Sequence, residues 1–200
     1  MSYLKQLRKD PVMQEIVKTV KISALEIKKP IYLQLIYSIM GQQLNTAVAK
    51  ILETRFHELF RKKIPTPKDI LDLPFMELRA IGLSTSKTNY ILNVCDFFIE
   101  NKVTDAQLHK MEDEELISYL TEIKGVGKWT VEMVMMFAMQ REDVFPTADL
   151  GIQQSMIKHY RIRNKEDKKA LMEKMTIIAE QWKPYRTYAC LYLWMNKLNC

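Results

Sequence analysis

Cysteine is scarce in this chain of 200 residues. The three cysteines, Cys95, Cys190 and Cys200, form no close pair, and an odd set of separated thiols does not indicate a disulfide framework. We therefore expect a reducing environment for the protein. Three thiolates are also too few for the usual four-cysteine iron–sulfur cluster. The three histidines show no metal-ligand spacing, so we expect no zinc site and no cofactor.

Long apolar runs are missing as well. No stretch of the sequence approaches the length that spans a bilayer. The N-terminal stretch MSYLKQLRKDPVMQEI mixes charged residues into every turn, unlike the apolar core of a signal peptide. We therefore expect no membrane partner.

Glycine and proline, which most often interrupt regular structure, number only five and seven. Apolar residues recur at three- and four-residue spacing along most of the chain, whereas strand-like alternation is rare. The pattern predicts an all-α fold, and an apolar fraction of 48% is typical of a protein with a real core. A net charge of +6 and a pI near 9.1 suit a polyanionic partner, although many proteins that bind no nucleic acid are mildly basic.

Several helices can be placed from their caps and apolar faces. From Asn45, one predicted helix face carries the apolar residues Val48, Ile51, Leu52, Phe56, Leu59 and Phe60. Thr66-Pro67-Lys68-Asp69 predicts a helix start, with an N-cap, a proline at the first helical position and an acid in the first turn. Ser84 and Asn164 are predicted N-caps of two further helices.

Three of the five glycines lie in two similar segments. Residues 78–84, LRAIGLS, and residues 121–127, TEIKGVG, each predict a helix, a glycine-bearing hairpin and a second helix. Glycine in such a hairpin permits positive φ and close approach of another backbone. By itself this similarity fits two ordinary helix ends equally well.

The second hairpin has features that suit a phosphate. A new helix is expected near Lys128, and the backbone N–H groups at its start have no intrahelical partner. These groups lie at the positive end of the helix dipole, while Lys124 and Lys128 add charge on either side. Such a hairpin can bind a backbone phosphate without reading sequence. A tight turn between two packed helices explains the glycines too.

Asp149 is the candidate catalytic residue. It lies after Pro146, which ends the preceding helical pattern, at the expected start of the next helix. An N-cap is the common role of aspartate at such a place. The two roles are compatible, because a capping carboxylate is held rigidly and stays ionised.

These segments resemble the helix-hairpin-helix DNA glycosylase superfamily, and within it the 3-methyladenine DNA glycosylase II (AlkA-type) branch. The resemblance is carried by residues 123–130 (IKGVGKWT), 143–149 (DVFPTAD), 180–189 (EQWKPYRTYA) with Trp194, 39–44 (IMGQQL), and 82–84 (GLS) with Lys87. The segments follow the family order over nearly the whole chain, and the second half is the most specific.

The resemblance implies an all-α fold of two helical lobes with a cleft between them. Residues 31–142 would form a central lobe containing the hairpin, and residues 1–30 and 143–200 a second lobe carrying the catalytic aspartate, Asp149. The implied base-pocket residues are Trp129, Met133 and Trp194. The implied DNA-binding residues are Gln42, Gln43, Leu44, Ser84, Lys87, Lys124, Gly125, Gly127, Lys128 and Thr130.

The loop of Gln42, Gln43 and Leu44 matches the loop that the family inserts into the duplex, and either Gln43 or Leu44 could be the wedge. The resemblance also allows a structural Na⁺ or K⁺ at the backbone of Thr121, Ile123 and Val126.

The resemblance implies a monofunctional enzyme that flips alkylated purines of the 3-methyladenine and 7-methylguanine class out of DNA and leaves an abasic site. Bifunctional relatives carry a nucleophilic lysine where this chain has Trp129. Cleavage of the glycosidic bond builds positive charge on the sugar, which a carboxylate stabilises. We expect double-stranded DNA containing damaged bases as the partner and a monomeric protein.

Three alternatives stay open at this point. One is a bifunctional oxidised-base glycosylase and AP lyase that uses a lysine Schiff base. Another is a non-catalytic helix-hairpin-helix DNA-binding module, although such a module needs neither Asp149 nor tryptophans at the pocket positions. The third, more remote, is a helical interaction protein whose hairpins are coincidental.

Overall fold

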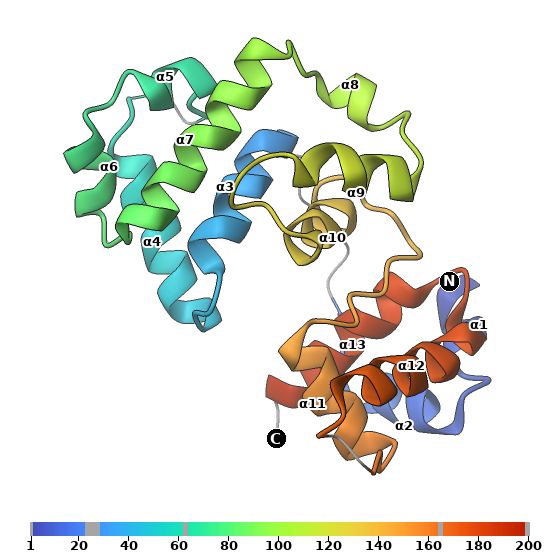
Figure 1. Ribbon diagram of the computed structural model, residues 1–200. Helices are drawn as coiled ribbons and strands as arrows, with labels where there is room; N and C mark the ends of the chain where they lie inside the picture. Colours follow the sequence, from blue (N-terminus) through green and yellow to red (C-terminus); the bar gives the residue numbers. More distant parts are fainter. Residues whose placement is uncertain (1, 23–28, 62–63, 164–165, 199–200) are drawn as a thin grey trace. The chain divides into compact units, whose positions relative to one another are not determined.

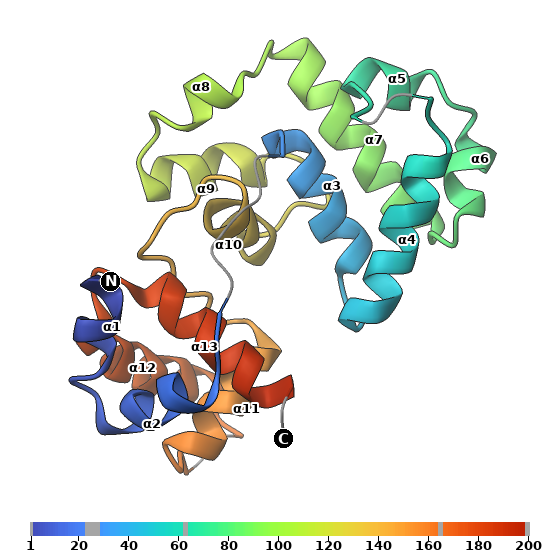
Figure 2. The same cartoon turned by 180° about the vertical axis from the view of Figure 1, so that it is seen from behind.

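The structure is a computed structural model that describes residues 2–22, 29–61, 64–163 and 166–198. Every regular element within these ranges is a helix, which confirms the predicted all-α class (Figures 1 and 2). The chain divides into two compact units, one of residues 1–26 with 140–200 and one of residues 27–139. The first unit is therefore built from both ends of the chain.

The second unit is organised around a central helix. It contains α3 (Ile31–Gly41), α4 (Thr46–Glu58), α5 (Pro67–Leu71), α6 (Phe75–Ala80), α7 (Thr85–Glu100), α8 (Asp105–Leu108), α9 (Asp113–Thr121) and α10 (Lys128–Phe137). Helix α3 packs against α4, α7 and α10 (Figure 1). Most of its residues are buried, as expected of a helix that is apolar on all sides.

The first unit is a smaller helical cluster. It contains α1 (Ser2–Leu7), α2 (Pro11–Thr19), α11 (Leu150–His159), α12 (Lys168–Ala179), the short 3₁₀ helix η1 (Glu180–Trp182) and α13 (Arg186–Leu198). Helix α13 packs against both α11 and α2. N-terminal and C-terminal segments thus share one core (Figure 2).

A buried carboxylate joins the segments of the first unit. Asp10 is 2% exposed and caps α2, where its Oδ1 accepts from the backbone N–H of Val12 at 2.8 Å. Its Oδ2 accepts from the indole Nε1 of Trp182 at 2.8 Å and from the hydroxyl of Tyr160. Because a buried charge is costly unless it is hydrogen-bonded, these contacts fix the two ends of the chain together. Trp182 itself is fully buried.

The predicted caps are partly confirmed. Thr66 forms a capping box with Asp69, and Ser84 caps α7 through the backbone N–H of Lys87 at 3.2 Å. Asn164 lies outside the described residues. The N-cap of α12 is Asp167, so the prediction of Asn164 for this helix is wrong.

The predicted apolar face of α4 is too wide. Leu52 and Phe56 are buried, but Val48 and Ile51 are 38% and 51% exposed. Helix α4 packs mainly against α3, and one neighbour covers a narrower stripe than a helix inside a bundle buries.

Among the residues with a described position, no helix combines the length and the apolar character needed to cross a membrane.

Candidate active site and nucleic-acid interface

Asp149 begins a helix. It is the N-cap of α11, with extended backbone angles of φ −70° and ψ 120°, and its Oδ1 accepts from the backbone N–H of Ile152 at 2.8 Å. The side chain is half-buried. The positive end of the helix dipole attracts negative charge at this place. The capping role is therefore real, and it fixes the carboxylate at the unit's surface.

A second donor reaches the same oxygen from another helix. The indole Nε1 of Trp194, on α13, donates to Asp149 Oδ1 at 2.8 Å. Gly151 makes room for this contact, because a Cβ at residue 151 would lie 2.9 Å from Trp194 Cδ1 and 3.0 Å from Asp149 Oδ1. The structure thus brings two of the predicted site residues, Asp149 and Trp194, into direct contact.

The segment that leads to Asp149 is fixed on the start of α13. Arg186 Nε donates to Asp143 Oδ1 at 2.7 Å, and its Nη2 donates to Asp143 Oδ2 at 2.9 Å. The hydroxyl of Thr187 accepts from the backbone N–H of Val144 at 2.9 Å and donates to the carbonyl of Arg141 at 2.6 Å. Such a paired guanidinium and carboxylate give geometric specificity.

The prediction that Pro146 ends the preceding helix is wrong. Helix α10 already ends at Phe137, well before the proline. Gln140 then has a positive φ of 56°, a conformation that L residues adopt in turns but not along a helix. Residues 140–149 therefore form a connection held by tertiary contacts.

The second hairpin has the predicted form. It joins α9 to α10, and Gly125 adopts a φ of 103°, which favours glycine. A Cβ there would meet Tyr90 Cγ at 2.1 Å, so the tyrosine ring packs directly on the glycine. Asn93, also on α7, donates from Nδ2 to the carbonyl of Lys124 at 3.0 Å. Helix α7 thus supports the hairpin.

Gly127 leaves the start of α10 open. It is the N-cap of that helix, has no side chain to cap it, and is exposed. A Cβ at this position would meet no atom within 4 Å. The backbone N–H groups of the first turn are available to an anion here, since a helix start provides such donors without an internal partner.

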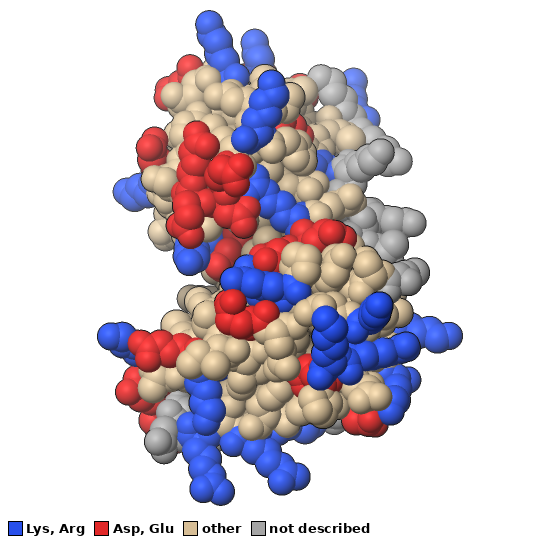
Figure 3. Space-filling view, turned by 90° about the vertical axis from the view of Figure 1, so that its right-hand side faces the viewer, with Lys and Arg blue, Asp and Glu red and all other residues tan. Residues whose placement is uncertain are grey.

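Charge is graded along α9 toward this hairpin. Its first turn carries Asp113, Glu114 and Glu115, whereas Lys124 and Lys128 flank the hairpin at its other end and are exposed. On the face drawn in Figure 3, several acidic side chains gather in one group in the upper half, while acidic and basic side chains lie beside one another elsewhere. The hairpin end also carries the exposed Glu122, so it is less acidic than the start of α9 and attracts a phosphate more strongly than that start does.

The loop after α3 forms a tight turn with an exposed tip. The backbone N–H of Leu44 donates to the carbonyl of Gly41 at 3.1 Å. Gln42 has φ −51° and ψ 128°, and Gln43 has φ 60°, which matches a type II β-turn with glutamine where glycine is usual. Gln43 is exposed and Leu44 is 41% exposed. Both therefore remain candidates for the wedge.

Lys87 and Gln42 hold this loop in place. Lys87 Nζ donates to the carbonyls of Met40 at 2.9 Å and Gln42 at 2.8 Å, and burial lowers the pKa of its ammonium. Gln42 Nε2 donates to the hydroxyl of Thr130 at 3.3 Å and approaches the carbonyl of Gly125 at 3.5 Å. The loop is thereby linked to the hairpin. Thr130 is 1% exposed, so its side chain supports the loop from inside the unit.

The remaining pocket candidates lie on α10. Trp129 is half-buried and Met133 is 6% exposed, with one helical turn between them. A residue one turn away lies on the same face of a helix. Trp129 and Met133 therefore share one side of α10.

Sequence reasoning missed several residues that shape these sites. Gly151 admits the Trp194 indole, Tyr90 covers Gly125, and Arg186 fixes the segment before Asp149. The rarity of glycine was a signal for Gly151, which stands two residues after Asp149. No sequence pattern pointed to Tyr90, because its contact depends on how α7 packs against the hairpin.

Comparison with known proteins places these features in a family. The model of the HhH-GPD superfamily base excision DNA repair proteins matches residues 36–181, from α3 to η1. The chain belongs to the HhH-GPD superfamily. This membership confirms the resemblance seen in the sequence, and the matched range includes the hairpin between α9 and α10.

Individual relatives agree. The chain is 33% identical to putative DNA-3-methyladenine glycosylase YfjP of Bacillus subtilis over 79% of its length, but spans only 56% of that relative. It is 34% identical to DNA-3-methyladenine glycosylase 1 of Schizosaccharomyces pombe, over 86% of this chain and 74% of the relative. The solved S. pombe 3-methyladenine DNA glycosylase Mag1, in complex with abasic DNA, superposes with a TM-score of 0.87 at 30% identity, covering 97% of this chain and 95% of Mag1.

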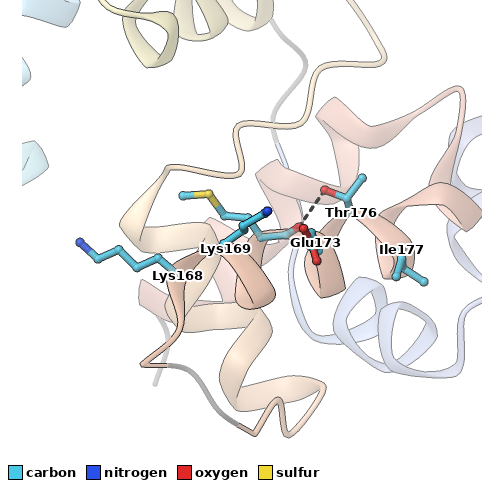
Figure 4. Close-up of a pocket in the computed structure, with 6 residues that line it drawn as sticks. Lys168, Lys169, Glu173, Thr176 and Ile177 are labelled. Atoms are coloured by element: carbon cyan, nitrogen blue, oxygen red, sulfur yellow. Dashed lines mark hydrogen bonds between the residues drawn. The ribbon is translucent and has the colours of Figure 1, made fainter.

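A surface depression elsewhere carries none of the residues discussed above. It has a volume of about 700 Å³ and is lined by side chains of α12 (Figure 4), namely Lys168, Lys169, Met172, Glu173, Thr176 and Ile177. Ile177 is 73% exposed. A hollow along one solvent-facing helix surface does not enclose a base.

In the part of the chain that the structure describes, no group of His, Cys, Asp or Glu is arranged to hold a metal ion.

Lys87 and Lys128 should have separable effects in this HhH-GPD protein. Lys87→Met removes the donor to two carbonyls, so we expect unfolding to become easier by about 1–2 kcal/mol, the cost of unpaired, partly buried acceptors. The slope of log Kobs against log salt for DNA binding should stay unchanged. Thermal melting and binding titrations at several salt concentrations measure the two quantities.

Lys128→Met is the matched control, because this lysine is exposed at the hairpin. It should reduce the salt slope by about one phosphate contact with little change in stability. A reduced slope without loss of stability in Lys87→Met would show that its ammonium contacts DNA instead.

Proposed function

We propose that this chain is a monofunctional DNA glycosylase that acts, as a monomer, on double-stranded DNA containing alkylated purines. The observation that carries the proposal is the carboxylate of Asp149. It is fixed at a helix start by two N–H donors from different helices, in a chain whose helix α10 also begins at an exposed glycine with open space around it.

The chemistry requires a fixed negative charge. Breaking the bond between a purine and its deoxyribose builds positive charge on the sugar. A preorganised carboxylate stabilises that charge without moving, and it can orient the attacking water. An alkylated purine already carries a positive charge and leaves easily, so the reaction needs little help from a general acid.

Base recognition would come from aromatic and apolar side chains. We propose that Trp129, Met133 and Trp194 contact the extruded base. An electron-poor alkylpurine stacks well on an indole ring, with a cation–π contribution of about 0.5–2 kcal/mol. Extrusion from the duplex costs a few kcal/mol, and less for a poorly paired damaged base.

DNA would be held mainly through its backbone. We propose that the first turn of α10, from Gly127, binds a phosphate, with Lys124 and Lys128 adding attraction. Ser84 and Gly82 form the corresponding turn before α7, where Gly82 has a φ of 113°. The tip of the Gln42–Leu44 turn would enter the gap that the extruded base leaves.

We also propose that the hairpin can hold a monovalent cation through the carbonyls of Thr121, Ile123 and Val126. Thr121 ends α9, and the carbonyls at a helix end carry partial negative charge. The Ile123 carbonyl already accepts from the N–H of Val126 at 2.9 Å. A carbonyl has a second lone pair for a cation, so this hydrogen bond leaves the Ile123 carbonyl able to contact one.

The product distinguishes this function from its rivals. Incubation with methylated duplex DNA should release 3-methyladenine and 7-methylguanine, measured by chromatography, and leave strands that break only after alkali or heat. The reason is that Trp129 occupies the position of the lysine nucleophile in bifunctional relatives. Strand nicking at neutral pH, or a covalent adduct trapped by borohydride, would indicate a lyase instead. Binding to abasic DNA without release of any base would indicate a non-catalytic module.

A further inference from the structure

We infer that Trp194 is a positioning residue, whose indole N–H sets the orientation of the Asp149 carboxylate for reaction. The inference rests on the proposed function. It differs from a base-stacking role of Trp194, since it depends on one hydrogen atom of the indole and not on the ring face.

One donor to the carboxylate of Asp149 comes from outside the helix that it caps. Ile152 N–H and Trp194 Nε1–H both donate to Asp149 Oδ1 at 2.8 Å. In contrast, Asp167 caps α12 through donors of its own helix, Lys169 and Ala170. The terminal torsion of aspartate is broad, so a cap bond alone leaves the plane of the carboxylate poorly defined. A second donor from α13 restricts that rotation.

Gly151 is explained by the same contact. Apart from proline, glycine is the poorest helix former, yet it occupies the first turn of α11. The φ of Gly151 is not positive, and the backbone there does not require glycine. What requires it is space, because a Cβ would lie 3.0 Å from Trp194 Nε1 and 3.0 Å from Asp149 Oδ1. Helix α11 therefore carries a residue of low helix propensity at the position that the indole of Trp194 approaches.

Helix α13 also holds the residues that precede Asp149 in the chain. Thr187 binds the backbone of Arg141 and Val144, and Trp194 lies about two helical turns further along the same helix face. One rigid helix thus holds both the start of the segment and the carboxylate at its end. Catalytic groups need such fixed orientation, since small misplacements slow reactions strongly.

The test separates the indole N–H from the indole ring. Trp194→Phe removes the donor and keeps an aromatic ring. Replacement of Trp194 by benzothienylalanine, in which sulfur takes the place of the N–H, keeps the shape as well. We expect both variants to excise 7-methylguanine about tenfold to a hundredfold more slowly in single-turnover assays, the effect of one hydrogen bond to a charged group. Affinity for abasic DNA should stay within about twofold.

The chain offers a matched control. Trp182 donates its indole N–H to Asp10 at the same distance, 2.8 Å, but is fully buried. Trp182→Phe should therefore lower the melting temperature and leave the single-turnover rate of the folded protein unchanged. Gly151→Ala, which displaces the indole, should slow excision like Trp194→Phe. The losses should not multiply in the double variant, because both changes act through one contact.

The outcomes are distinct. If benzothienylalanine at residue 194 excises at the wild-type rate, the N–H does not position Asp149, whatever Trp194→Phe does. If both replacements lower the rate only as far as they lower stability, Trp194 is a packing residue. The proposed function is tested by a separate result: it is wrong if the wild-type protein releases no base from methylated DNA.

Discussion

Asp149→Asn should slow the excision of 7-methylguanine by about a thousandfold or more, corresponding to roughly 4 kcal/mol of barrier. The substitution keeps the shape of the side chain and removes the charge that opposes the developing sugar cation. Its remaining carbonyl oxygen can still accept from Ile152 N–H and Trp194 Nε1–H, which both donate to Asp149 Oδ1. Single-turnover excision measures the loss directly.

Folding should change little in this variant, because asparagine caps helices about as well as aspartate. Thermal melting and affinity for abasic DNA therefore serve as controls. A residue that only caps α11 would give the reverse pattern, with near-normal excision and any loss following stability. A rate within about tenfold of wild type, a difference of only ~1.4 kcal/mol, would exclude Asp149 as the catalytic carboxylate.

Gly127→Asp should weaken DNA binding by at least about tenfold while stabilising the fold slightly. Aspartate is a better N-cap than glycine by a few tenths of a kcal/mol, and the space around residue 127 is open. The new carboxylate would occupy the N–H groups of the first turn of α10 and repel the phosphate from them. Binding should weaken for all duplex sequences alike, because a phosphate contact carries no sequence information.

Two further substitutions at residue 127 separate the causes. Gly127→Ala adds a methyl group that meets no neighbour, so binding should stay near wild type. Gly127→Asn caps the helix without a charge and should give an intermediate loss. If Gly127→Asp binds abasic DNA as tightly as wild type at moderate salt, the hairpin is not the phosphate anchor.

Opposite trends in stability and binding are useful because they cannot arise from unfolding. In a destabilised variant, DNA affinity and melting temperature fall together. Gly127→Asp should instead raise the melting temperature and lower the DNA affinity. The same logic applies to Trp194 and Trp182. These two tryptophans make chemically identical bonds to aspartates, but only one of those aspartates belongs to the candidate site.

Local sequence predicted those features that depend on a few neighbouring residues. The capping box at Thr66, the cap at Ser84 and the positive φ of Gly82 and Gly125 follow from side chains and glycines within single turns. Prediction from local sequence failed for features that depend on packing between helices. It could not tell that α4 packs mainly against α3 and leaves Ile51 half-exposed, nor that the helix before Pro146 ends at Phe137.

The sequence by itself determined the all-α class, the family, and the aspartate at a helix start, because periodicity, caps and ordered motifs are written along the chain. The tertiary structure decided which partners those residues have. It brought Trp194 to Asp149 across 45 positions of sequence, placed Lys87 on the carbonyls that precede the exposed turn, and set Tyr90 over Gly125. Such contacts depend on how helices that are distant in the sequence pack against each other. The packing sets the 2.8 Å between Trp194 Nε1 and Asp149 Oδ1, and the residues adjacent to either one in the sequence do not.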